Sequence, residues 1–236
     1  MVVRDRTGGD GLGKKTPTKM NFAGIIPKYR LPIGIVLIFC LISGYFYFYN
    51  QFWTHLDSKT FNFLAEYIGS RIRGHRGRQV LVHRDFYKIA DQINRYAVKN
   101  NLHLLITQSY RPPNKKVHDA IVAPAVKSNH LAGHALDFNM VYGGKVFESR
   151  DLTSGNFSKL PVFIKGFIND VRSDTDIRWG GDFETEDPVH LDDGLNIKDI
   201  KKWEQHYGQC VTDYMNAEPK WLSRVKRILK GIFDDV

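Results

Sequence analysis

The stretch SNHLAGHALDF, residues 128–138, constrains the fold more than any other part of the chain. His130 and Asp137 lie seven residues apart and are joined through Gly133, which is typical of a loop that leads into a strand. Side chains alternate between the two faces of a strand, so Ala135 and Asp137 are expected on the same face. A small alanine beside the aspartate leaves room for a metal ion and its water. The stretch therefore predicts that His130 and Asp137 converge on one ion.

A second motif supplies what this site still lacks. The sequence WGGDF, residues 179–183, is followed by DPVH, residues 187–190. We expect His190 to bring a third ligand from a separate strand, while Asp187 lies beside the metal without binding it. Catalytic zinc sites use three protein ligands and leave one position to water, and a nearby carboxylate is suited to act as the general base. The two motifs together predict a hydrolytic zinc site.

Two other metal arrangements fit the sequence less well. His130 and His134 have the i, i+4 spacing of helical zinc proteases, but Leu131 stands where those enzymes need glutamate. The chain has two cysteines, Cys40 and Cys210, which are too few for a zinc site built from cysteine clusters. The ligands are therefore expected to be histidines and a carboxylate.

Around these motifs, strand and helix patterns alternate with turn signals. Strands are expected over 79–83, 102–109, 134–142, 145–148, 177–179 and 189–191, and helices after Asp57-Ser58, after Asp85, and over 160–171, 197–207 and 221–233. The Gly143-Gly144 pair indicates a hairpin. The fold class predicted from this mixture is α+β, with a small, largely antiparallel sheet that carries the metal site between flanking helices.

Residues 31–53 predict a single N-terminal transmembrane helix. This run of 23 residues holds no charged side chain, and at ~1.5 Å per residue it reaches ~34 Å, enough to cross a bilayer. Tyrosines and Trp53 crowd its C-terminal end, as at a membrane interface. A cleaved signal peptide has a shorter apolar core and small residues at its cleavage site. A buried core helix is the remaining alternative.

The charge distribution sets the expected orientation. Residues 1–30 carry seven of the basic residues and two aspartates, so this tail holds +5 of the formal net charge of +9. Positive flanks stay in the cytoplasm, which places residues 54–236 in the periplasm or outside the cell. A basic cluster at Arg71, Arg73, Arg76 and Arg78 is interpreted as a solvated linker, with anionic lipid or cell-wall phosphate as the alternative. With the tail set aside, the charge gives no reason to expect nucleic acid binding.

These observations divide the chain into five parts. Residues 1–30 are expected to form a disordered basic cytoplasmic tail, 31–53 the anchor, and 54–79 a linker and helix. The zinc domain is expected over 80–195, followed by C-terminal helices over 196–236.

The combined motifs resemble a known enzyme family. Ser-x-His-x-x-Gly-x-Ala-x-Asp, then Trp-Gly-Gly-Asp-aromatic, then Asp-x-x-His is similar to the zinc D-alanyl-D-alanine carboxypeptidases and L-alanyl-D-glutamate endopeptidases of bacterial and phage cell-wall lysis (VanY-like peptidases). The turn Ser109-Tyr110-Arg111 matches as well, and the resemblance covers about residues 80–195. It implies a Hedgehog/DD-peptidase-like fold with zinc on an antiparallel sheet.

The resemblance also implies a role for each matching residue. The zinc ligands are His130, Asp137 and His190; the catalytic base and acid is Asp187; Arg111 holds substrate or stabilises the oxyanion; and Ser128, Tyr110, Trp179 and Asp182 contact substrate or support the site. Asp187 stands where carboxypeptidases of the family carry glutamate, which favours an endopeptidase.

The implied substrate is the stem peptide of peptidoglycan, and the implied cofactor is Zn²⁺. The expected function is therefore a membrane-anchored peptidoglycan peptidase, more an L-Ala-D-Glu type endopeptidase than a D-Ala-D-Ala carboxypeptidase. Two alternatives stay open: a non-catalytic, zinc-stabilised binding domain tethered to the membrane, and a phage lysis enzyme.

Overall fold

The structure is a computed structural model that describes residues 34–44, 54–115 and 125–234. The chain divides into two compact units, Met1–Phe48 and Tyr49–Val236, and each is described by itself. The expected cytoplasmic tail, residues 1–30, lies outside the described residues.

The first unit contains one described helix, over residues 34–44. Its side chains are apolar apart from Ser43, and large ones such as Ile35, Phe39 and Leu41 are exposed. Within the described ranges, no helix combines the length and the hydropathy needed to cross a membrane. The rest of the expected span, residues 31–33 and 45–53, lies outside those ranges, so the anchor stays a prediction.

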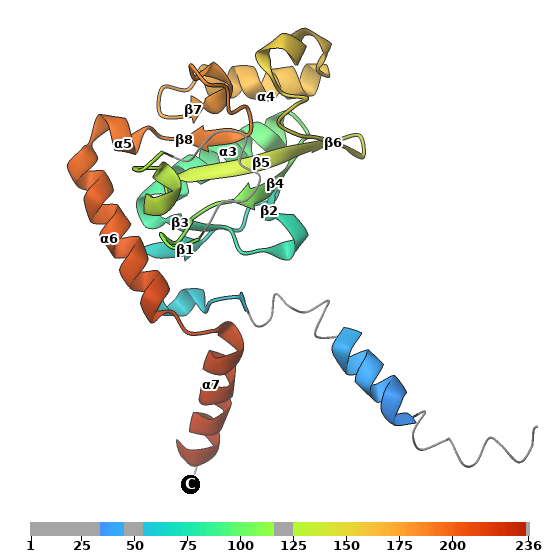
Figure 1. The fold of residues 1–236 in the computed structure, drawn as a ribbon, viewed down its shortest axis with the longest axis vertical. Coiled ribbons are helices and arrows are strands. Elements are labelled where there is room, and N and C mark those ends of the chain that lie inside the picture. The colour runs from blue at the N-terminus through green and yellow to red at the C-terminus, as the bar shows by residue number, and fades with distance from the viewer. Residues whose placement is uncertain (1–33, 45–53, 116–124, 235–236) are drawn as a thin grey trace, which may run out of the picture. The chain divides into compact units, whose positions relative to one another are not determined.

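The second unit is built on two sheets (Figure 1). The larger sheet has the order β2-β4-β5-β8-β7, with β6 paired to β5. Its strands are β2 (Ile72–Gly74), β4 (His103–Gln108), β5 (Ala135–Tyr142), β6 (Lys145–Phe147), β7 (Arg178–Trp179) and β8 (His190–Asp192). All of these pairs are antiparallel except β2 with β4. The smaller sheet pairs β1 (Leu64–Glu66) with β3 (Leu81–His83).

Helices cover the sheet unequally. The helices of this unit are α3 (Tyr87–Lys99), α4 (Val162–Arg172), α5 (Leu195–Lys198), α6 (Ile200–Asn216) and α7 (Lys220–Asp234). Helices α3 and α4 pack on one face through buried residues such as Ile93 and Phe167, against Leu136 and Phe138 of β5. Because side chains alternate along β5, Asp137 faces the opposite side. Helix α6 runs along the side of the domain (Figure 1) and packs on η5 (Asn129–Ala132), a 3-10 turn.

The mixed α+β class is confirmed, with three local differences. Leu64–Glu66 is a strand, although the spacing of apolar residues after Asp57-Ser58 predicts a helix there. The basic cluster is part of the fold, because Ile72–Gly74 forms β2 and pairs with β4. That pairing is parallel, whereas the hairpin signals indicate antiparallel neighbours. All three differences result from pairing with strands that are distant in the sequence, and the local spacing of apolar residues does not predict such pairing.

Candidate metal centre

Three predicted ligand atoms meet on the face of the sheet opposite α3 and α4. Nε2 of His130 lies 3.0 Å from Oδ1 of Asp137 and 3.2 Å from Nδ1 of His190. Nδ1 of His190 lies 2.9 Å from the same Asp137 oxygen. The side chains form one of the groups able to hold a metal ion, and both histidines are largely enclosed. The structure therefore brings together the three residues that the sequence motifs select.

Strand register accounts for the meeting of Asp137 and His190. The two residues are direct partners across the antiparallel pair β5–β8. Side chains of such a pair lie on the same face with Cβ atoms ~4.5–5.5 Å apart. Two residues along, Ala135 is the partner of Asp192 on this face. Its small side chain leaves space for the Asp192 carboxylate.

His130 reaches the site from the turn η5, which is held at both ends. Oγ of Ser128 accepts from the amide of His130 at 3.4 Å and caps the turn. Gly133 ends the turn with φ +73°, a left-handed conformation that favours glycine. A Cβ at Gly133 would also lie 2.6 Å from the backbone nitrogen of His83. Ser128 therefore supports the ligand loop, and Gly133 lets it pack closely.

The outer nitrogen of each ligand histidine has a fixed acceptor. Nδ1 of His130 donates to the carbonyl oxygen of Ser109 at 2.9 Å. Nε2 of His190 donates to Oδ2 of Asp192 at 3.0 Å. Because these nitrogens carry the protons, the inner nitrogens of neutral imidazoles are lone pairs that face each other and the Asp137 carboxylate. Three electron-rich atoms in mutual contact require a cation, so the donor set fits a divalent metal ion.

The pKa shifts of His190 and Asp137 also favour positive charge among the three ligands. Burial disfavours the charged form of His190, but hydrogen bonds to Asp137 and Asp192 outweigh it and raise the pKa of His190 to about 10. Burial also disfavours the Asp137 carboxylate, yet His130 and His190 hold its pKa well below the usual range. The surroundings of the three side chains thus favour positive charge at this point.

Asp187 lies beside this centre, outside the group of three ligands. The Asp187 amide donates to the carbonyl oxygen of Gly180 at 2.8 Å. The backbones are so close here that a Cβ at Gly180 would lie 2.2 Å from the Asp187 carbonyl oxygen, so this position needs glycine. Burial raises the pKa of Asp187, and the charge of Asp137 adds to the rise. A carboxylate with a raised pKa is better matched to proton transfer near neutral pH.

Arg111 lies close to the ligands, whereas Trp179 belongs to the hydrophobic core and contacts the loop that carries Asp187. Arg111 is buried, and its amide donates to the His130 carbonyl oxygen at 2.9 Å. Burial lowers the pKa of Arg111, and the Asp137 carboxylate opposes this shift only in part. The indole nitrogen of Trp179 donates to the carbonyl oxygen of Pro188 at 2.8 Å, within the loop that carries Asp187. Arg111 thus brings positive charge close to the ligands, and Trp179 supports the loop.

The remaining two residues from the motifs lie away from the ligands. Tyr110 packs in a small cluster with Leu81 and Cys210, and its enclosed hydroxyl has no hydrogen-bond partner. Asp182 is exposed and forms an ion pair with Arg172, whose guanidinium lies 4.6 Å from the centre of the Trp179 ring. Both residues occupy packing or bracing positions in this structure.

Sequence reasoning missed Asp192, which connects the centre to its surroundings. Arg178 donates to both of its oxygens at 2.7 Å, and Nδ2 of Asn129 donates to one of them at 2.9 Å. These bonds and His190 hold the pKa of Asp192 well below the usual range, against the effect of burial. Its spacing of two residues after His190, which puts both on one strand face, is the sequence signal that points to it.

Comparison with known proteins gives one family match. Residues 122–193 match the family model described as D-alanyl-D-alanine carboxypeptidase. This stretch contains the three ligands and Asp187. A crystal structure of Serratia marcescens L-Ala D-Glu endopeptidase ChiX is similar, with 19% sequence identity over 49% of this chain and 82% of that chain and a TM-score of 0.34. No curated protein matches the chain. The family match supports the resemblance to cell-wall peptidases and, with it, the expectation of a peptidase.

Proposed function

We propose that this chain is a membrane-anchored zinc peptidase that cleaves the peptidoglycan stem peptide, with a preference for the L-Ala-D-Glu type of bond. The observation that carries the proposal is the convergence of His130, Asp137 and His190. The outer ring nitrogen of each histidine donates a hydrogen bond to a neighbour, so the inner nitrogens are free to bind the ion. The preference for an internal bond is supported by Asp187, because the carboxypeptidases in the resemblance carry glutamate there.

His130, Asp137 and His190 would hold the zinc ion. When bound, zinc supplies a Lewis acid and lowers the pKa of a water molecule from 15.7 towards ~7. The neutral His130 and His190 and the anionic Asp137 leave one positive charge of the ion uncompensated.

Asp187 is placed to move the proton of the reaction. It accepts a proton from the attacking water as the new C–O bond forms at the peptide carbonyl. It then returns that proton to the amine as the C–N bond breaks. Its raised pKa favours both transfers near neutral pH.

Arg111 is placed to oppose the negative charge that develops on the carbonyl oxygen. Its guanidinium stays protonated and is held by burial close to the ligands. A donor aimed at a developing oxyanion contributes ~3–4 kcal/mol to lowering the barrier.

The anchor is proposed over residues 31–53. The large side chains that the described helix over 34–44 exposes are all apolar, as a lipid-facing segment requires. The basic residues that precede it favour an N-terminus in the cytoplasm and residues 54–236 on the outer side. Cell fractionation tests this: the full chain is expected in the membrane fraction after a carbonate wash, and a chain lacking 31–53 in the soluble fraction. Equal distribution of the two would contradict the anchor.

Mass spectrometry of digested peptidoglycan tests the function. The full chain, purified in detergent, is incubated with cell-wall fragments with and without a chelator. The expected product is a peptide that begins with D-Glu, absent when the chelator is present. Release of free D-alanine would instead show a carboxypeptidase. The absence of any product from zinc-loaded protein would favour the non-catalytic binding domain.

A further inference from the structure

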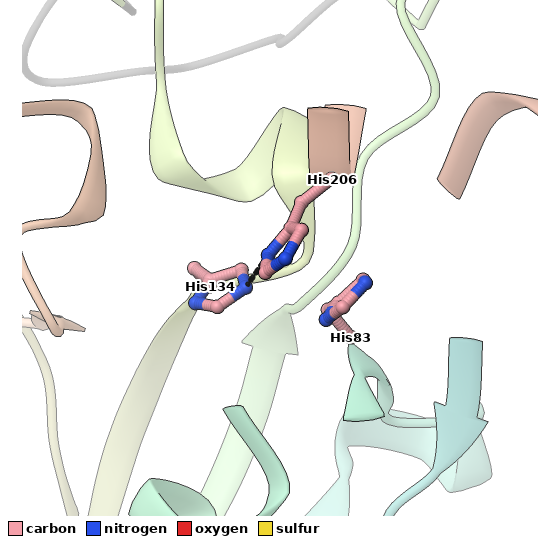
Figure 2. Close-up of side chains that lie close together, drawn as sticks. All are labelled: His83, His134 and His206. Atoms are coloured by element: carbon pink, nitrogen blue, oxygen red, sulfur yellow. Dashed lines mark hydrogen bonds between the residues drawn. The ribbon is translucent and has the colours of Figure 1, made fainter. Parts of the chain in front are cut away.

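Three buried histidines meet at a second place, which the proposed mechanism does not use. His83 ends β3, His134 immediately precedes β5, and His206 lies on α6 (Figure 2). Their exposed fractions are 3%, 2% and 4%. Each offers one ligand atom, and these atoms all lie within 4.8 Å of one another. Within the ranges that the structure describes, this histidine cluster and the catalytic centre are the two groups able to hold a metal ion.

The proton of His134 is fixed by an acidic partner. Its Nδ1 lies 2.6 Å from Oδ2 of Asp193, and because a carboxylate accepts, that nitrogen carries the proton. Its Nε2 is therefore a lone pair. It lies 2.8 Å from Nδ1 of His206, as the dashed line in Figure 2 shows.

A neutral His206 has one proton for two neighbours, His134 and Asp85. If its Nδ1 holds the proton and donates to His134, its Nε2 presents a lone pair 3.5 Å from Oδ2 of Asp85. If its Nε2 holds the proton, two lone pairs face each other at 2.8 Å. A cation bound to both inner nitrogens would let both outer nitrogens donate to carboxylates, His134 to Asp193 and His206 to Asp85. Metal-bound histidines commonly have this carboxylate support.

The surroundings of His206 favour its neutral form. Burial lowers its pKa to about 4, and the neighbouring His83 and His134 lower it further than Asp85 raises it. Burial also lowers the pKa of His83. The cluster is thus held in the neutral form that binds metals.

His83 is the ligand that must change its contacts. Its Nδ1 accepts from the amide of Asp85 at 3.1 Å, and its Nε2 lies 3.0 Å from Oε1 of Gln209. Its ring stacks on that of His206, with centroids 3.8 Å apart. Coordination through Nε2 would give up the contact to Gln209, and coordination through Nδ1 would give up the contact to the Asp85 amide. His83 is therefore expected to be the weakest of the three ligands.

We propose that His83, His134 and His206 form a second site for a divalent transition-metal ion of the zinc class, separate from the catalytic centre. Imidazole ligands suit zinc, copper and nickel, and a water completes the coordination of three protein ligands. The three ligands come from β3, the start of β5 and α6. The ion would tie α6 to the loop that positions His130.

Zinc stoichiometry tests the second site. The full chain in detergent is stripped with a chelator, reloaded with Zn²⁺, and its bound metal is measured by mass spectrometry. We expect two ions per chain, and one ion for the double variant His134→Gln/His206→Gln. The control His75→Gln changes a histidine outside both groups and should keep two. One ion in the unmodified chain, or an unchanged number in the double variant, would overturn the proposal.

A second arm leaves the histidine cluster intact, so it does not depend on how the cluster variants fold. The variant Asp137→Ala/His190→Ala removes the catalytic ligands and is expected to keep one zinc ion. X-ray absorption should show three imidazole ligands, and added Zn²⁺ should raise the temperature of unfolding. No retained zinc and no shift would show that the cluster is held by hydrogen bonds alone. This arm gives its answer whether or not the chain cleaves peptidoglycan.

Discussion

The catalytic centre and the histidine cluster use the same residue type in opposite electrostatic settings. At the centre, contacts to Asp137 and Asp192 outweigh burial and raise the pKa of His190 to about 10. In the cluster, burial and two neighbouring histidines lower the pKa of His206 to about 4. The centre combines a carboxylate ligand with Asp187 and Arg111 close by, as hydrolysis requires. The cluster has three neutral ligands drawn from separate elements, which suits a structural role.

The largest effect is expected from Asp187→Asn. Removal of a general base costs ~10²–10⁴-fold in turnover. The ligands are untouched, so zinc at the catalytic centre should be retained. Turnover and bound zinc are measured on the same sample. Unaltered turnover in this variant would contradict the role of Asp187 and reduce the contrast between the two regions.

Two adjacent aspartates allow the regions to be separated. Asp192 accepts from His190, whereas Asp193 accepts from His134. Loss of a carboxylate behind a metal-bound histidine weakens metal affinity ~10–100-fold. Asp192→Asn should therefore weaken zinc binding at the catalytic centre, and Asp193→Asn at the histidine cluster.

Competition with a metal-binding dye measures both variants, with circular dichroism as the control for folding. Because Asp192 also accepts from Arg178 and Asn129, its variant is expected to be the less stable of the two. If both variants lose affinity at the same site, the division into two regions is wrong.

The pH dependence of cleavage sharpens the role of Asp187. Burial and Asp137 raise its pKa above the usual ~3.9. Asp187 must be ionised to accept a proton, so kcat/KM should be high above the raised pKa and fall as the pH drops through it. Zinc content is measured at every pH. If kcat/KM falls in parallel with zinc content at every pH, the decrease at low pH is caused by protonation of the zinc ligands and not of Asp187.

The smallest effect is expected from Asp182→Asn. Asp182 is exposed and pairs with Arg172 away from the ligands, and exposed ion pairs contribute ~0–1 kcal/mol to stability. Cleavage should stay within about twofold of the unmodified chain, which makes this variant a matched control for Asp187→Asn. A large loss of turnover with unchanged stability would show that Asp182 acts at the site.

The sequence predicted the parts of the fold and site that depend on local pattern. The alternation in β5 and the turn at Gly133 indicate a loop that leads into a strand, and this placed His130 and Asp137 together. His190 was expected as the third ligand from the DPVH motif on a separate strand, and the resemblance implies the same role. The membrane span and the domain boundaries stay predictions.

The missed parts depend on contacts between distant segments. Leu64–Glu66 and Ile72–Gly74 are strands because β3 and β4 pair with them, although the local pattern of the first segment favours a helix. The histidine cluster joins residues 83, 134 and 206, so no sequence spacing identifies it. Tyr110 was selected only because its turn matches the resemblance, and its side chain packs in the small cluster with Leu81 and Cys210.

Restoration of activity by zinc tests the central claim most directly. The full chain is stripped of metal, and the release of peptides from peptidoglycan is followed before and after addition of one to two equivalents of Zn²⁺, beside the variant His190→Ala. We predict that stripping abolishes release, that zinc restores it in the unmodified chain, and that it does not in the variant. Release that persists without metal, or that zinc restores equally in His190→Ala, would contradict a catalytic zinc ion held by His130, Asp137 and His190.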